Sequence, residues 1–196
     1  MQQKKRRQKK LQELAKNDDY AIYFQDEVHF KLTLTIVRAW FLAGVTPEIK
    51  SPTDRFKLSV FGAMGKNGQL ITRPEAVFDA KTFKQFLQQL IDQAMVVDEK
   101  TKRRKKILLV LDNARYHHAN LLKDWLLEVS DTLELFFLPP YSPDINAIEM
   151  LWKKTRRAVT HNRFFQSIDE LSHAVQQFWK QFSNPNAELQ KLTAFI

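Results

Sequence analysis

The sequence predicts an α/β domain in which helices flank a mixed sheet of five strands, three early antiparallel strands followed by two later parallel ones. Three observations lead to this expectation. Strand-like segments and a glycine-containing turn come first in the chain, as in hairpins. Helical and strand-like segments then alternate, which is typical of parallel strands joined by helical crossovers. One late segment holds five consecutive large apolar residues, so both of its faces must be covered.

The first three strands are expected at residues 20–24, 56–61 and 69–71. The first reads YAIYF, an aromatic and β-branched run, and the second alternates apolar with other residues. Between the second and third lies GAMGKNG (62–68). A hairpin turn is expected here rather than a phosphate-binding loop, because no GK[ST] follows and no helical pattern begins after it. Residues 31–54 are expected to be irregular.

The later elements follow from apolar spacing and from capping residues. Asp79 or Thr82 can cap a helix, and Ser142-Pro143 is a typical helix start, with serine at the cap and proline at the first position. The pair Pro139-Pro140 ends a strand. The expected elements are a helix to about 94, the ILLVL strand at 107–111, a helix around 121–126, a strand at 133–138, a helix from 143 to about 159, and a last helix at 168–182.

Length and composition indicate one ordinary domain. The chain has 196 residues, 44% of them hydrophobic, which is enough for a core. It has no cysteine, which excludes disulfides, thiolate zinc sites and cysteine nucleophiles. No apolar run approaches the ~20 residues of a membrane span, and a cytoplasmic location is expected. We divide the chain into a basic arm or linker remnant at 1–19, a domain at 20–182, and a tail at 183–196.

The net charge of +9 is concentrated in two clusters. Residues 1–10 hold six Lys and Arg side chains without an acid, and residues 100–106 hold another six. Without these 12 charges, the other 179 residues carry a net charge of −3. Such clusters suit a polyanion, because neutralised phosphates release counterions. A solvated charge run or a localisation signal is the alternative.

Three acidic residues stand at the ends of expected elements. Asp26 follows the first strand, Asp112 directly follows ILLVL, and Glu149 lies on the helix after Ser142-Pro143. Taken singly, each would be read as a turn, cap or surface residue. Together they can converge at one edge of the sheet, where three carboxylates need cations to stay ionised. Oxygen ligands favour Mg²⁺ or Mn²⁺, and a two-metal site of this kind suits in-line phosphoryl transfer.

The sequence around these acids resembles the three catalytic blocks of mariner-like DDE transposases, in particular their bacterial insertion-sequence branch, the IS-six-thirty group. The blocks are QDEVHF, LVLDNARYHHA and FLPPYSPDINAIEMLWKKTRR. The resemblance covers about residues 19–182. It implies an RNase H-like catalytic domain whose Asp-Asp-Glu triad is Asp26, Asp112 and Glu149. Ala147 departs from the proline that the family commonly has there, a change that we expect a helix to tolerate.

Residues beside the triad are expected to assist it. Glu27 and Asn113 adjoin the catalytic acids but should point to the other face of their strands, so we expect them to support the ligands. Asn146, Lys153 and Arg156 share one helical stripe with Glu149. Given the resemblance, Asn146 is expected to support the site, and the two cations to contact substrate phosphates. The alternative is a solvated stripe with one ion pair.

Further candidates have weaker support. A loop before the ILLVL strand is expected to contact DNA phosphates through Lys102, Arg103, Arg104 and Lys105. Three histidines could bind phosphate or carry protons, although a lone histidine is more often structural: His29, His117 and His118.

The resulting hypothesis is a transposase catalytic domain that uses Mg²⁺ or Mn²⁺ to hydrolyse phosphodiesters at element ends and to join the freed 3′ ends to target DNA. Its expected partners are double-stranded DNA, further copies of itself in the active complex, and a separate or upstream helix-turn-helix segment, which the family usually has and this sequence lacks. The alternatives are an RNase H-like nuclease without strand transfer and a domesticated, non-catalytic DNA-binding remnant.

Overall fold

A computed structural model describes residues 2–33, 35–38, 43–44, 56–98, 101–140, 142–182 and 185–195. Its centre is a five-stranded sheet with the strand order β3-β2-β1-β4-β5. The antiparallel β1, β2 and β3 form one half, and β4 and β5 extend the sheet parallel to β1. The predicted mixed sheet is therefore confirmed. The strands are β1 Tyr20–Lys31, β2 Lys57–Gly65, β3 Leu70–Pro74, β4 Lys106–Leu111 and β5 Leu133–Phe137.

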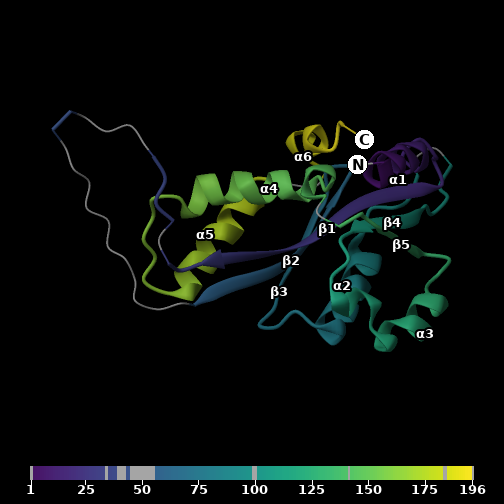
Figure 1. Cartoon of the computed structure of the whole chain (residues 1–196), viewed down its shortest axis with the longest axis horizontal. Coiled ribbons are helices and arrows are strands. Elements are labelled where there is room, and N and C mark those ends of the chain that lie inside the picture. The colour runs from purple at the N-terminus through teal and green to yellow at the C-terminus, as the bar shows by residue number, and fades with distance from the viewer. Residues whose placement is uncertain are drawn as a thin grey trace.

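Helices cover both faces of the sheet (Figure 1). One face packs against α1 (Gln2–Leu14), α4 (Ile148–Thr155), α5 (Ile168–Lys180) and α6 (Ala187–Leu192). The other packs against α2 (Ala80–Gln93) and α3 (Asn120–Glu128). Successive residues of β4 point into the two cores in turn, so all five residues of the ILLVL segment are buried. This confirms the expectation that both faces of β4 are covered.

The first strand is longer than the sequence indicated. It was expected to end near Phe24, yet β1 continues to Lys31 because Val28 and Phe30 resume the alternation into the core. The intervening Gln25-Asp26-Glu27 hides that alternation in the sequence. Asp26 therefore lies within a strand and not at its end.

The expected turn at 62–68 is also shorter than predicted. Strand β2 continues to Gly65, and only the residues after it turn. Gly62 lies inside β2, where a Cβ atom would come within 2.4 Å of the Trp152 ring. Glycine at this position lets α4 pack closely on the strand that neighbours β1.

The helix expected from Pro143 begins later. Pro143–Ile145 form only a 3₁₀ turn, and α4 starts at Ile148. Asn146 interrupts the helix with an extended backbone (φ −99°, ψ 104°). Its side-chain amide donates to the carbonyl of Gln25 at 2.9 Å, which ties this loop to β1.

Both ends of the described chain pack on the same core. The basic segment expected to be a frayed helix or linker forms α1, whose Leu11 side chain is only 1% exposed. The expected tail contains α6, whose Leu189 is fully buried. Among the described residues, no helix has the length and apolarity needed to cross a membrane.

Candidate active site

Asp26, Asp112 and Glu149 line one pocket of about 460 Å³. The pocket lies where β4 and β5 end, and the loop that leads to α4 forms its wall. Because β1 and β4 are parallel neighbours with Phe24 opposite Val110, Asp26 and Asp112 lie at the same level of the sheet. The rest of the pocket wall comes from the loops after β4 and after β5 and includes Asn113, Ala114, Leu138, Pro139, Pro140, Ser142, Pro143 and Asn146.

Trp152 holds Asp26 in place. Its indole Nε1–H donates to Asp26 Oδ2 at 3.1 Å, and the ring is buried in the core. Trp152 follows Glu149 by three residues, so both side chains lie on one face of α4. The contact between Trp152 and Asp26 was not predicted from the sequence. The i, i+3 spacing of the two residues was the available signal.

The pKa of Asp26 departs strongly from its usual value. Burial raises the pKa of its carboxyl group to about 8, and the neighbouring charges of Glu27 and Glu149 add to the shift. Ionising a buried carboxyl group costs free energy, and a cation bound beside it offsets that cost. The raised pKa of Asp26 is therefore a property expected of a cation ligand.

The pKa of Asp112 is shifted in the opposite direction, below its usual value. The pKa of this half-exposed carboxyl is lowered mainly by His117 and also by the backbone N–H of Ala114, although partial burial opposes the shift. The Ala114 N–H donates to Asp112 Oδ1 at 2.9 Å. Asp112 thus remains an anion at the mouth of the pocket while Asp26 resists ionisation.

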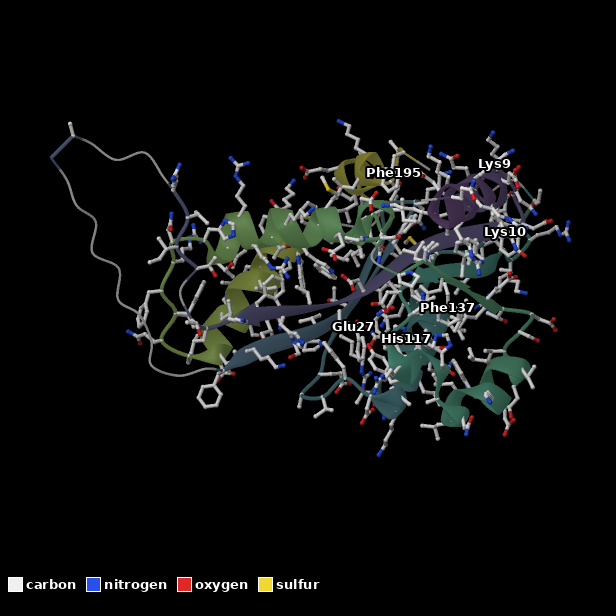
Figure 2. All side chains as sticks on the ribbon, viewed as in Figure 1. Lys9, Lys10, Glu27, His117, Phe137 and Phe195 are labelled. Atoms are coloured by element: carbon white, nitrogen blue, oxygen red, sulfur yellow. The ribbon has the colours of Figure 1, made fainter. Side chains whose placement is uncertain are left out.

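His117 and Glu27 lie behind Asp112, on the α2 side of the sheet (Figure 2). His117 Nε2 lies 3.4 Å from Glu27 Oε1, and its Nδ1 lies 3.4 Å from Asp112 Oδ1. Burial alone would lower the pKa of His117, but the two carboxylates outweigh this and raise it to about 9. Ligand atoms of Glu27, Asp112 and His117 lie within 4.8 Å of one another, close enough to hold a metal ion.

The pocket itself fits a hard divalent cation. Its donors are carboxylate and amide oxygens, which Mg²⁺ and Mn²⁺ prefer. The side-chain oxygen of Asn146 is buried and has no hydrogen-bond partner within the described structure, although Asn146 lines the pocket beside Glu149. A buried acceptor without a donor is costly, and a cation or its bound water would satisfy it.

A family model described as DDE superfamily endonuclease matches residues 21–172. The chain belongs to this family. The matched segment contains Asp26, Asp112 and Glu149, and the enzyme class expected from the sequence is confirmed.

Two curated relatives are similar to parts of the chain. The insertion element IS630 uncharacterized 39 kDa protein of Shigella sonnei is 25% identical over 166 residues, which are 84% of this chain and 46% of that protein. The uncharacterized protein y4pE/y4sA of Sinorhizobium fredii (strain NBRC 101917 / NGR234) is 34% identical over 84 residues, which are 39% of this chain and 58% of that protein. The chain spans about half the length of the curated relatives it matches.

Solved structures of Mos1 transposase share the fold. The paired-end complex with the left transposon end gives a TM-score of 0.70 at 17% identity, covering 98% of this chain and 57% of that one. The catalytic domain of Mos1 mariner transposase gives 0.58 at 18% identity, covering 98% and 93%. The Mos1 mariner paired end complex with Mn gives 0.72 at 16% identity, covering 99% and 58%. The RNase H-like fold is therefore confirmed.

The basic run at 100–106 of this DDE endonuclease lies far from the pocket. It precedes β4, whereas Asp112 follows β4, so about 20 Å separate them at a rise of ~3.3 Å per residue. Several of its charges are engaged: Lys105 pairs with Asp98 and Asp18, and Arg104 donates to the Ile91 carbonyl. Lys102 and Arg103 are exposed, and Lys100 lies outside the described residues.

The other residues predicted from the sequence lie at separate positions in the fold. Lys153 is exposed on α4, and Arg156 begins the π-helical turn that follows it. Asn113 lines the pocket and donates to the Leu138 carbonyl, so it faces the site rather than the opposite side. His29 contacts the hydroxyl of Ser59 at 2.8 Å on β2. His118 is exposed and stacks on Phe137, away from the acids.

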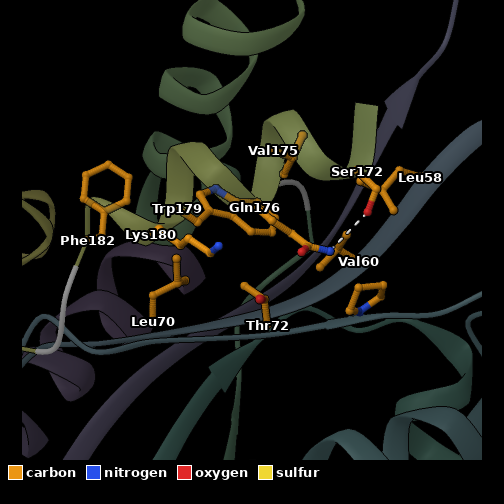
Figure 3. Close-up of a pocket in the computed structure, with 11 residues that line it drawn as sticks. Leu58, Val60, Leu70, Thr72, Ser172, Val175, Gln176, Trp179, Lys180 and Phe182 are labelled. Carbon is orange, nitrogen blue, oxygen red and sulfur yellow. Dashed lines mark hydrogen bonds between the residues drawn. The ribbon is translucent and has the colours of Figure 1, made fainter. Parts of the chain in front are cut away.

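A second pocket of about 480 Å³ lies between α5 and strands β2 and β3 (Figure 3). Its wall is formed mainly by apolar side chains such as Val60, Val175 and Trp179, and Gln176 donates to Ser172 within it. No carboxylate lines this pocket.

Proposed function

We propose that this chain is the catalytic domain of a DDE transposase that cuts DNA at element ends and joins the freed 3′ ends to target DNA. The observation that carries the proposal is the convergence of Asp26, Asp112 and Glu149 in one pocket, from β1, the end of β4 and α4. Family membership and the shared fold agree with this assignment.

Asp26, Asp112 and Glu149 would hold two Mg²⁺ or Mn²⁺ ions, which supply activation of the attacking oxygen and stabilisation of the leaving oxygen. Paired-end complexes of Mos1 solved with Mn and with Mg support the choice of metal. Trp152 fixes Asp26 on the pocket wall, and the Asn146 amide anchors the loop that leads to α4, the helix that carries Glu149. The chain thus provides a preorganised set of oxygens and needs no covalent intermediate.

The two reactions have the same chemical balance. In hydrolysis, a water oxygen bonds to phosphorus, the bond to the 3′ oxygen breaks, and a proton ends on the freed 3′ hydroxyl. In joining, that 3′ oxygen bonds to a target phosphorus and displaces the target's own 3′ oxygen. One pocket can therefore serve both steps, because only the attacking oxygen differs.

The first turn of helix α1 carries basic residues close to the pocket. Lys4 pairs with Asp144, next to the pocket residue Pro143, and the Arg7 guanidinium lies 5.3 Å from the Phe136 ring. Four cations of α1 line a hollow together with Glu13: Arg6, Arg7, Lys9 and Lys10. Figure 2 labels Lys9 and Lys10 on this helix. We infer that this α1 surface contacts DNA phosphates beside the cut, and that the 102–105 run is a more distant contact.

The proposed whole protein has further parts. The Mos1 structures include a paired-end complex with the left transposon end, which supports action of this chain on the ends of a DNA element. Since the chain matches about half of its curated relatives, sequence-specific end recognition would belong to a helix-turn-helix segment that is upstream or separate.

Incubation with a pre-cut element end, a target duplex and Mn²⁺ tests the proposed function. The expected result is a covalent joint between the 3′ end and the target, and EDTA should prevent it. Hydrolysis without any joint would favour the RNase H-like nuclease. Absence of both reactions, with DNA binding retained, would favour the domesticated remnant.

A further inference from the structure

His117 connects two acids on neighbouring strands. It lies in the 3₁₀ turn Arg115–His118 (η1), five residues after Asp112. His117 Nδ1 lies 3.2 Å from the backbone carbonyl of Asp112 and 3.4 Å from its carboxylate. Nε2, which has no hydrogen-bond partner within the described structure, lies 3.4 Å from Glu27 Oε1 on β1. The His117 side chain is 0% exposed, so water does not reach the ring. The ring therefore bridges a pocket acid and a carboxylate on the opposite face of the sheet.

His117 and Glu27 are both held by neighbouring side chains. The His117 ring packs against Phe83 at 4.3 Å and Tyr116 at 4.5 Å between centroids. Glu27 is only 14% exposed, and it accepts a hydrogen bond of 2.9 Å from the Gln25 amide. The far end of the bridge thus rests on the central strand and on the α2 core, both rigid elements.

Asp112, in contrast, needs support. It follows the last residue of β4, and its side chain is 57% exposed. The described structure gives its carboxylate only two neighbours, the Ala114 N–H and His117. A half-exposed carboxylate at a strand end samples several rotamers, and a metal site requires one of them.

We propose that His117, held by Glu27, is a positioning residue that orients the Asp112 carboxylate for the divalent cation in the pocket. This role rests on the proposed function. Outer partners that hydrogen-bond ligating carboxylates typically contribute 10–100-fold in metal affinity. The contribution of His117 should therefore appear first in cation binding.

A cation between Glu27, Asp112 and His117 would be the rival explanation for the close approach of these groups. The geometry disfavours it, because the two ring nitrogens point at different carboxylates. A cation coordinated by one ring nitrogen would leave the carboxylate that lies beside the other ring nitrogen without a partner. The ring is better placed as a bridge than as a ligand.

The test measures Mn²⁺ affinity by titration calorimetry in His117→Ala, in Glu27→Gln and in the double variant. We expect Kd for Mn²⁺ to rise about 10–100-fold in His117→Ala and less in Glu27→Gln. The double variant should have the same Kd for Mn²⁺ as His117→Ala, because Glu27 acts on Asp112 only through His117. Excess Mn²⁺ should restore most of the cleavage rate, since the ligands themselves remain.

Leu122→Ala is the matched control for lost packing. Leu122 is buried in the same core and contacts no pocket carboxylate in the described structure, so Tm should fall while Kd for Mn²⁺ stays unchanged. A Kd within about threefold of wild type in both His117→Ala and Glu27→Gln would overturn the positioning role. If wild-type protein bound no Mn²⁺ and cut no DNA, the proposed function would fail instead, so the two failures are distinguishable.

Discussion

Asp26→Asn is expected to abolish cleavage and, in the absence of metal, to make the protein more stable. Loss of one ligand removes Lewis-acid stabilisation of several kcal/mol, so the cleavage rate should fall on the order of a thousandfold. The fold should persist, because an asparagine oxygen can still accept the Trp152 hydrogen bond. Near wild-type cleavage by this variant would refute the assignment of Asp26.

The stability effect follows from the raised pKa of Asp26. Its folded pKa of about 8 lies above its usual value of 3.8, so the native state binds a proton more tightly than the unfolded state. The free energy of unfolding of wild-type protein should therefore fall as pH rises from about 4 to about 8. Each unit of difference between the folded and unfolded pKa corresponds to about 1.4 kcal/mol of stability. Because Asp26→Asn removes the group that carries this cost, the free energy of unfolding of the variant should exceed that of wild type by a few kcal/mol at pH 8.

Thermal unfolding in EDTA checks this result. Asp26→Asn should raise Tm by about 5–10 °C at pH 8 and change it little at pH 4. Asp112→Asn is the matched control, since the pKa of Asp112 is lowered and its charge is stabilising in the fold. That variant should also lose cleavage but gain no stability. Equal Tm changes in the two variants would contradict the opposite environments of the two acids.

Neutralising α1 is expected to weaken DNA binding strongly. The variant changes Arg6, Arg7, Lys9 and Lys10 to glutamine, which preserves helix propensity. Each lost phosphate contact should reduce the slope of log K against log salt by roughly 0.9, or about 3.6 for four contacts. Over a fourfold change in salt this corresponds to about a hundredfold difference in affinity.

The comparison variant neutralises Lys102, Arg103, Arg104 and Lys105, which removes the same number of charges at the other end of β4. We expect a smaller change in slope, because part of this run is already engaged in ion pairs and backbone hydrogen bonds. Filter binding or fluorescence anisotropy on one duplex over a salt series measures both variants. A larger effect in the 102–105 variant would show that DNA lies along the opposite end of the sheet.

Most of the architecture could be predicted because local patterns agreed with the final packing. The ILLVL run required cover on both faces, and β4 is central and buried. The three acids could be chosen from their flanking blocks, and all three line one pocket. The mixed character of the sheet followed from hairpins before βα units, whereas the strand order came only from the structure.

The errors arose where long-range contacts override local pattern. Gln25-Asp26-Glu27 reads as a strand end, yet β1 continues because Val28 and Phe30 find the core. Asn146 breaks the helix expected from Pro143 because its amide bonds to β1, 121 residues away in sequence. The contact of His117 with Glu27 was hidden for the same reason, since the two residues are far apart in sequence and meet only in the folded chain.

Anomalous diffraction from crystals grown with Mn²⁺ and a DNA end tests the central claim most directly. The map locates each ion without reliance on activity. The account predicts two anomalous peaks in the pocket, coordinated by carboxylate oxygens of Asp26, Asp112 and Glu149. A single peak between Glu27, Asp112 and His117, with none beside Asp26 and Glu149, would contradict it.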